Sequence, residues 1–307
     1  MRRRWVALIV ATSCVASVLV IVGVDCLLLN ARINHVAIDH PQHQNGSTFV
    51  VVGSDSRSGN LPAGLSPLVG STQAVPGQRA DVVEVVHFQR SRISVLTLPR
   101  DLLVSPRPFV LERLALTLSG GPQQLVDALC RTTGISTSHL VIVEFGAFVG
   151  IVDALGGIVV DLPHPIRDPR SSLLIESAGR QRIDGMTALA LVRSRNPSWL
   201  IDRKWVAQPN GAIERSDWTG RVFHAVAVAL AHNLWDPLAV QRVAWSGAGS
   251  LTTDQSTGIL DLMKLANSTN VPTVVSARQV PGSLAVAPDK ATYRSLAKAG
   301  YKSGCSP

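Results

Sequence analysis

The sequence predicts a layered α/β/α domain with a central mixed β-sheet, preceded by one N-terminal transmembrane helix. An apolar, uncharged run at residues 5–24 predicts the membrane helix. Further along, short runs rich in β-branched residues alternate with longer helical patterns, which is typical of α/β layers. Two of these runs, 82–88 and 93–98, are close enough in sequence to form a hairpin, so we expect a mixed sheet.

The N-terminal segment is interpreted as an uncleaved anchor over residues 1–29. Arg2, Arg3 and Arg4 precede the apolar run, and basic residues before a span predict a cytoplasmic N-terminus with the domain outside. A cleaved signal peptide is the competing interpretation. It is disfavoured because the run exceeds the usual length of roughly 7–15 residues and no small-x-small cleavage site follows it. A lipoprotein at Cys26 is disfavoured by the charge of Asp25 just before it.

Composition restricts the class of protein. With 46% hydrophobic residues in 307, the chain can build a sizeable core. The part after the anchor carries 26 basic and 20 acidic residues. Positive charge outside a membrane favours phosphate-bearing envelope material or lipid headgroups, and we expect no nucleic acid partner. Cys130 and Cys305 lie in the oxidising compartment, so one disulfide is allowed by the sequence but not decided by it.

The remaining chain is divided into three parts. Residues 30–47 are polar and are expected to be a linker, in which His35, His40 and His43 are interpreted as linker residues rather than metal ligands. Residues 48–235 are expected to form the catalytic domain. Residues 236–307 carry no assignable motif and are expected to be a C-terminal extension that packs on this domain.

The elements of the domain follow from periodicity. A buried strand is expected at 49–52, and a hairpin turn near Arg90 would place Asp81 opposite Arg100 at the open end of the hairpin. Residues 196–217 are expected to form a long loop. Further strands are expected at 140–145 and 158–162, and helices at 121–130, 148–155, 186–191, 221–234 and 257–266.

Two arginines stand at the exit of one predicted helix. Asp184 is a plausible N-cap for the helix at 186–191, and Asn196-Pro197 ends regular structure. Arg193 and Arg195 are two residues apart, and on an extended segment such residues share a face. The two guanidinium groups are therefore expected to converge on an anion, the alternative being ordinary surface arginines.

More charged residues occur at the ends of the expected strands. They are Asp55 and Arg57 after the first strand, Arg79 and Asp81 before the hairpin, and Arg100 and Asp101 after it. Loops at strand ends are favoured ligand sites in α/β sheets. Two carboxylates with several arginines suit a pyrophosphate bound with a divalent cation. The alternative is that the aspartates are turn and cap residues with which the arginines merely pair.

Several motifs in series resemble the LytR-CpsA-Psr family. The resemblance covers roughly residues 48–235. Its motifs are GSDSRSG at 53–59, RADVVEVVHF at 79–88, LPRD at 98–101, VDALGGIVVDLP at 152–163 and AGRQRIDGMTALALVRSR at 178–195.

The resemblance implies a phosphotransferase that moves a glycopolymer phosphate from a polyprenyl-pyrophosphate carrier to peptidoglycan. The resemblance is also compatible with a pyrophosphatase activity. It implies that Asp55 and Asp81 bind Mg²⁺ or Mn²⁺. Arg193, Arg195 and Arg100 would be catalytic. Arg57, Arg79 and Arg221 would bind the pyrophosphate. Apolar residues around 149–160 and the helix from Arg221 would line a slot for the lipid tail.

The sequence departs from the family pattern in two places. His224 and Ala225 stand where the family has an Arg-Gln pair, and Ala115 stands where an asparagine is common. A histidine is largely uncharged near neutral pH, so reduced turnover is one consequence of the first departure. The alternative function is therefore a degenerate member that binds polyprenyl-phosphate lipid or envelope polymer without transfer. A transcription regulator is disfavoured because the domain would lie across the membrane from DNA.

Overall fold

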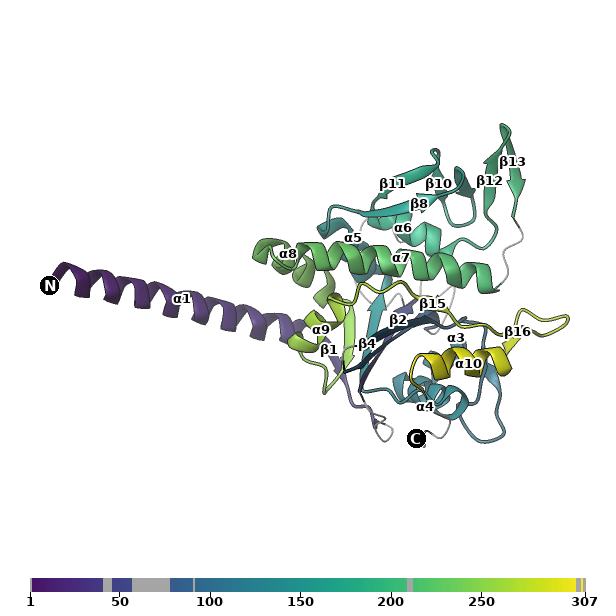
Figure 1. Ribbon diagram of the computed structural model, residues 1–307, viewed down its shortest axis with the longest axis horizontal. Helices are drawn as coiled ribbons and strands as arrows, with labels where there is room; N and C mark the ends of the chain where they lie inside the picture. The colour runs from purple at the N-terminus through teal and green to yellow at the C-terminus, as the bar shows by residue number, and fades with distance from the viewer. Residues whose placement is uncertain are drawn as a thin grey trace.

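The computed structural model describes residues 2–40, 46–56, 78–90, 92–208, 212–301 and 305. Its most extended feature is the helix α1, Arg2–Arg32, which projects from one end of the folded domain (Figure 1). Within α1, the segment Thr12–Arg32 is long enough to cross a membrane, and it contains an 18-residue window with a mean hydropathy of 2.3. The helix therefore fits a single N-terminal membrane span.

The domain is built on a seven-stranded sheet with the strand order β1-β14-β7-β2-β3-β4-β15. β2 pairs in parallel with β7 and antiparallel with β3, so the sheet is mixed, as predicted. The hairpin register is also as predicted, since Gln89 pairs with Arg92 and Glu84 with Thr97. The strands are β1 Asn34–Val36, β2 Ser47–Ser54, β3 Ala80–Gln89, β4 Arg92–Thr97, β7 His139–Glu144, β14 Leu251–Asp254 and β15 Thr273–Val274.

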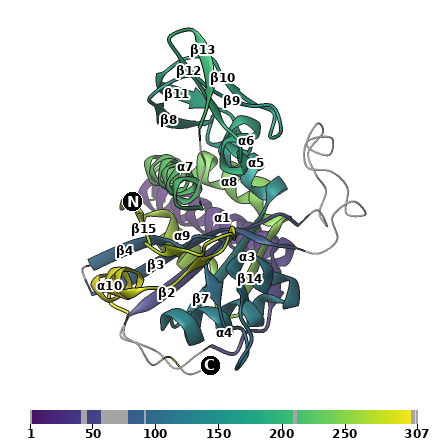
Figure 2. The same ribbon diagram turned by 90° about the vertical axis from the view of Figure 1, so that its right-hand side faces the viewer.

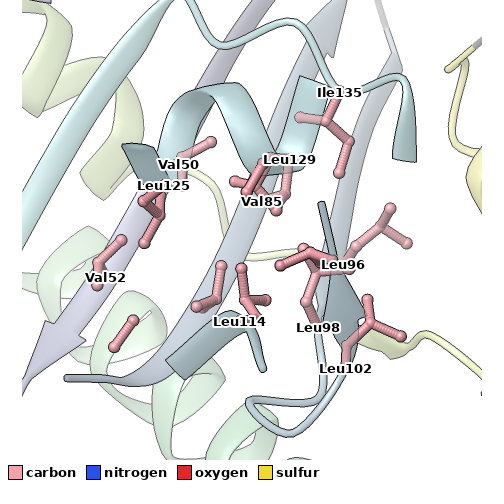
Figure 3. Packing of buried hydrophobic residues seen from close by; sticks show 14 of the residues in the cluster. Val50, Val52, Val85, Leu96, Leu98, Leu102, Leu114, Leu125, Leu129 and Ile135 are labelled. Atoms are coloured by element: carbon pink, nitrogen blue, oxygen red, sulfur yellow. The ribbon is translucent and has the colours of Figure 1, made fainter. Parts of the chain in front are cut away.

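Helices cover both faces of this sheet, which confirms the layered α/β/α class (Figure 1). On one face lie α3 Leu114–Thr117, the 3-10 turn Leu118–Gly120, α4 Pro122–Thr133 and α10 Lys290–Lys298. Val50 and Val85 of the sheet pack there against Leu125 and Leu129 of α4, all fully buried (Figure 3). On the other face lie α5 Phe145–Ala154, α6 Gly185–Arg193, α7 Ala212–Asn233, α8 Pro237–Ala248 and α9 Ile259–Ala266.

Two small sheets stand beyond α6 and α7 (Figure 2). One pairs β8 Ile158–Leu162 with β11 Gly179–Ile183. The other has the order β10 Leu173–Ile175, β9 Ile166–Asp168, β12 Ser198–Ile201 and β13 Lys204–Ala207. The short pairs β5 Leu103–Val104 with β6 Glu112–Arg113, and β16 Arg278–Gln279 with β17 Val286–Ala287, complete the strands that the structure describes.

The structure differs from three expectations about the irregular parts. The segment expected as a linker contains β1, and His40 Nε2 lies 3.2 Å from an oxygen of the buried Asp254; His43 is outside the described residues. The expected loop at 196–217 contains the hairpin β12–β13 and the first turns of α7. The C-terminal part supplies β14 and β15 to the central sheet. Such short strands leave no periodicity to detect, and their partners are distant in sequence.

The C-terminus is tied to the domain by a disulfide. Cys130 on α4 and Cys305 are bonded, with their Cα atoms 5.2 Å apart. The sequence left this pairing open. The other cysteines, Cys14 and Cys26, are free and lie on α1.

Candidate functional site

A cavity of about 1010 Å³ lies between the central sheet and the helices α5 to α9. Its floor is the face of the sheet that carries Val51, Gly53 and Val141. One end is lined by charged side chains, which we call the polar end. The rest is lined mainly by apolar side chains from α1, α5, α7, α8 and α9, together with Asp25, Asn233 and Gln241, and we call this the apolar end.

Six of the predicted site residues line the polar end of this one cavity. They are Asp55, Arg79, Asp81, Arg100, Arg193 and Arg195. They come from the ends of β2, β3 and β4 and from the exit of α6, four places separated in the sequence. Arg57 lies outside the described residues.

A β-bulge turns Asp81 toward the cavity. Gly53 of β2 pairs with Val82 but the next residue, Ser54, pairs with Ala80, so Asp81 is the extra residue on β3. Strict alternation would point Asp81 into the opposite core with Val83. A bulge breaks this alternation and re-aims the side chain, and both Asp81 and Val82 line the cavity as a result.

Backbone contacts hold Asp55 and Arg79 together. Arg79 N–H donates to Asp55 Oδ1 at 2.6 Å, and Asp55 N–H donates to the Arg79 carbonyl at 3.1 Å. These bonds fix the end of β2 against the start of β3. Because the backbone of Arg79 makes them, its guanidinium group is left to reach the cavity that it lines.

Arg100 forms an ion pair with Asp81. It also approaches Asp101, with 3.9 Å between Arg100 Nε and Asp101 Oδ1. In the part of the chain that the structure describes, Arg100 Nε is buried and donates no hydrogen bond. A buried donor without an acceptor is costly, so an anion in the cavity would satisfy it.

The charged groups of the polar end act on the pKa of Asp81. Burial raises the pKa of Asp81; Arg100, Arg195 and Arg79 act to lower it, and the charge of Asp55 adds to the rise. The net effect is a pKa above the ordinary value of 3.8. The ionised form of Asp81 is therefore less stable in the folded protein than in water, and a cation bound nearby would offset this penalty.

The two carboxylates meet the chemical requirement for a hard divalent cation. Mg²⁺ is bound through one or two carboxylates together with substrate phosphate oxygens. Within the described residues there is no group of three or more His, Cys, Asp or Glu side chains that would form a site made of protein ligands alone. Asp55 and Asp81 fit a metal that is held jointly with a phosphate-bearing substrate.

Arg193 and Arg195 lie where α6 ends. The side chain of Asp184 caps the helix by accepting from Thr187 N–H at 2.8 Å, as predicted. Ser194 leaves the helical conformation, with φ −59° and ψ 126°. Because the chain leaves the helix at Ser194, the side chains of both Arg193 and Arg195 line the cavity. The Arg193 guanidinium lies 5.4 Å from the ring centre of Phe145.

Asp168 is a functional candidate that the sequence did not reveal. Its side chain is buried, and Oδ2 accepts from Ser194 Oγ at 2.8 Å and from the N–H groups of Arg195 and Asn196 at 2.9 Å. Burial acts to raise the pKa of Asp168, but these hydrogen bonds and that from Arg170 N–H outweigh it and lower the pKa. Asp168 therefore fixes the backbone that carries Arg195.

The structure does not bring Arg221 to the cavity. Arg221 Nε bonds to Asp217 Oδ2 at 2.9 Å on the exposed side of α7, and its guanidinium stacks on Trp218. The cavity is lined instead by Ser216, Thr219 and Phe223 of this helix. An α-helix presents residues three or four apart on one face, which excludes position 221 from that set.

The residues that depart from the family pattern also lie away from the polar end. His224 does not line the cavity, and its Nδ1 is buried without a hydrogen-bond partner among the described residues. Ala225 packs on the small core under β8 and α6. Ala115 is buried and its N–H donates to the Arg100 carbonyl at 2.8 Å. These substitutions leave the described charged lining intact.

The apolar N-terminal helix fits a single-pass membrane protein, and the α/β/α domain behind it encloses a cavity lined by both charged and apolar side chains. The chain belongs to the LytR-CpsA-Psr family, because residues 28–205, more than half of it, match the LytR_cpsA_psr family. This family is involved in attaching cell-wall glycopolymers to peptidoglycan.

Individual relatives support the assignment. The chain is 32% identical over 182 residues to the probable cell wall biosynthesis protein LcpB of Corynebacterium glutamicum, which covers 58% of this chain and 44% of LcpB. The chain spans about half the length of the curated relatives it matches. A LytR-Csp2A-Psr enzyme from Actinomyces oris has a TM-score of 0.74 and 34% identity, covering 88% of this chain and 97% of that one.

More distant structures show the same fold. TagT of B. subtilis has a TM-score of 0.59 at 14% identity, covering 87% of this chain and 97% of TagT. A structure of TagT bound to LIIa-WTA has a TM-score of 0.60 at 14% identity, covering 86% of this chain and 96% of that one.

Proposed function

We propose that this protein is a membrane-anchored phosphotransferase that moves a glycopolymer phosphate from a polyprenyl-pyrophosphate carrier to peptidoglycan. The observation that carries this proposal is that the polar end and the apolar end belong to one cavity. Its lining suits a ligand with an anionic head and a long apolar tail. A polyprenyl pyrophosphate has both parts.

The charged residues have complementary roles in this proposal. Arg193, Arg195 and Arg100 would grip the oxygens of the pyrophosphate by charge-assisted hydrogen bonds, with Arg79 beside them. Asp55 and Asp81 would hold Mg²⁺ or Mn²⁺, which neutralises phosphate charge when it is bound. Arg57 remains proposed from the sequence alone. Arg221 is not part of the described cavity lining, so a role for it requires movement of α7.

The bond changes are those of a direct displacement. A hydroxyl of peptidoglycan attacks the phosphorus next to the glycan, the bond to the bridging oxygen breaks, and the polyprenyl phosphate leaves. The hydroxyl proton is lost to a base or water. The arginines stabilise the negative charge on the oxygens during the attack, and they are already in place before it.

The topology forms part of the proposal. With Arg2, Arg3 and Arg4 on the cytoplasmic side, α1 would cross the membrane once and the domain would lie outside it. That is the side on which peptidoglycan lies. The solved complex of the related TagT with LIIa-WTA supports a wall-polymer ligand for this fold.

The proposal is tested with the full chain in nanodiscs. A polyprenyl-pyrophosphate glycan, Mg²⁺ and peptidoglycan are added, and both glycan incorporation and release of polyprenyl phosphate are measured. We expect both, and we expect chelation by EDTA to abolish them until Mg²⁺ or Mn²⁺ is restored. Saturable binding of the lipid without either product would contradict transfer and would instead support the degenerate, lipid-binding alternative.

A further inference from the structure

Large apolar side chains are exposed at one end of the domain. Trp235 is 93% exposed, Leu238 70% and Leu260 81%, and Met263 is exposed as well. These four residues, which we call the basal patch, belong to the turn between α7 and α8, the start of α8 and the helix α9. Figure 1 shows α8 and α9 at the end of the domain from which α1 projects.

The helix α1 is docked on this end of the domain. Trp245 Nε1 and Gln241 Nε2, both on α8, donate to Asp25 Oδ1 at 3.0 and 3.2 Å. The Arg32 guanidinium lies 4.4 Å from the ring centre of Trp245, and Leu29 is buried. The orientation of the domain relative to α1 is therefore fixed by contacts.

This docking locates the surface of the bilayer. The uncharged run of α1 ends at Val24, directly before Asp25. A charged residue at the end of a span lies at the membrane surface. Gln241 and Trp245 bond to Asp25, so α8 lies against this level, and Trp235 and Leu238 of the basal patch stand at the start of α8.

The apolar end of the cavity extends to this level too. Leu234, Pro237 and Ile259 line the cavity and are adjacent in sequence to residues of the basal patch. On the other side, Val22 and Cys26 of α1 line the same cavity. The mouth is thus formed jointly by the domain and by the helix that enters the membrane.

We propose that the basal patch is immersed in the interfacial layer of the bilayer, and that the cavity opens there directly into the lipid. Burying exposed apolar surface is favourable, and tryptophan is enriched at membrane interfaces. The lipid chain of a substrate then enters beside α1 without crossing water. This inference rests on the proposed membrane topology, but not on phosphotransfer.

Depth-dependent quenching tests the inference on the full chain. Single cysteines are introduced by Trp235→Cys or Leu260→Cys in a background of Cys14→Ser and Cys26→Ser, labelled with the fluorophore NBD, and reconstituted in phosphatidylcholine–phosphatidylglycerol vesicles. Leu174→Cys is the matched control, because Leu174 is an exposed apolar residue on β10 in the small sheets away from α1 (Figure 1).

We expect a blue-shifted emission and strong quenching by doxyl-labelled lipid at positions 235 and 260, and neither effect at 174. Equal responses at all three positions would overturn the inference. Protection of 235 and 260 from both doxyl lipid and aqueous iodide would also overturn it, since that result indicates a protein partner over the patch.

A second measurement separates this inference from the proposed function. The double variant Trp235→Glu with Leu260→Glu is expected to use a bilayer-embedded polyprenyl substrate at least about tenfold less efficiently. Its use of a short-chain, water-soluble pyrophosphate substrate should be unchanged. Equal loss on both substrates contradicts the inference. If the parent chain transfers neither substrate, the proposed function fails, and the quenching result still decides the inference.

Discussion

Arg100 forms an ion pair with Asp81 across the open end of the β3–β4 hairpin. The pair exists because the hairpin register brings the two residues opposite each other and because a bulge turns Asp81 to the cavity side. Asp81 is thereby a carboxylate that faces both a cation of the protein and the space for a ligand. Its electrostatic state has consequences that can be measured.

Asp81→Asn is expected to stabilise the protein at neutral pH while lowering transfer at least about 100-fold. Because the folded-state pKa of Asp81 is raised, folding favours its protonated form, and wild-type stability falls as pH rises through that pKa. Asp81→Asn removes the carboxyl group, so the variant does not lose stability in this way as pH rises. Thermal unfolding of the metal-free protein at pH 7 and near pH 3.5 should show a stabilisation only at pH 7; a variant less stable at both pH values would contradict the prediction.

Replacing Arg193 and Arg195 together by alanine should abolish transfer and leave the fold intact. Both side chains line the polar end, and losing one such electrostatic contact costs roughly 10²–10³ in rate. Glycan incorporation and circular dichroism measure the two effects. Arg180→Ala is the control, since Arg180 is an exposed residue of β11 outside the cavity lining. Normal transfer by the double variant would show that the site is elsewhere.

Asp168→Ala is expected to destabilise the protein by about 1–3 kcal/mol, because it removes the acceptor of the buried Ser194 hydroxyl and of the N–H groups of Arg195 and Asn196. The lowered pKa means that the stabilisation by Asp168 is present above the ordinary carboxyl pKa and is lost as pH falls through the folded value. Urea unfolding as a function of pH checks this. We also expect KM for the lipid substrate to rise, and an unchanged KM would argue against a positioning role.

Gly220→Ala should destabilise the protein although alanine favours helices by about 1 kcal/mol. A Cβ at position 220 of α7 would lie 2.8 Å from Thr97 Oγ1. That hydroxyl cannot move freely, because it donates to the buried Glu84 at 2.8 and 2.9 Å. Overpacking of this kind costs about 1–3 kcal/mol.

Gly249→Ala is the matched control for this substitution. A Cβ at Gly249, the C-cap of α8, meets nothing within 4 Å. Its effect on the midpoint of thermal unfolding should be neutral or slightly stabilising. A similar response of the two variants would mean that α7 does not pack tightly against β4.

Loss of the disulfide between Cys130 and Cys305 should lower stability by roughly 2–5 kcal/mol, because the bond closes a loop with a sequence separation of 175 residues. Cys305→Ser, compared with Cys14→Ser in thermal unfolding, measures this effect. Equal unfolding midpoints would contradict it.

Local patterns were sufficient for much of the fold. The periods of strands and helices predicted β2, β3, β4, β7, β8, α4, α5, α6, α7 and α9, and the register of one hairpin followed from its turn. The short strands β1, β14 and β15 could not be found in this way. Each has two to four residues, and its place in the sheet depends on partners far away in the chain.

For the candidate site too, the sequence predicted some residues and not others. Residue types and spacing were enough to select Asp55, Arg79, Asp81 and Arg100, which do line one cavity. The family resemblance also implied Arg221, which does not line the cavity, because a resemblance says nothing about which face of α7 turns inward here. Asp168 was missed because a single aspartate at the end of a short strand carries no signal until the exit of α6 folds against it.

Local patterns in the sequence were therefore enough to predict the apolar helix, the order of the main elements and the charged residues of the candidate site, because these patterns involve neighbours within a few positions. The tertiary structure alone decided the bulge at Asp81, the support of Arg195 by Asp168 and the docking of Asp25 on Trp245. The physical reason is that each of these features is a contact between groups that are brought together only when the layers pack.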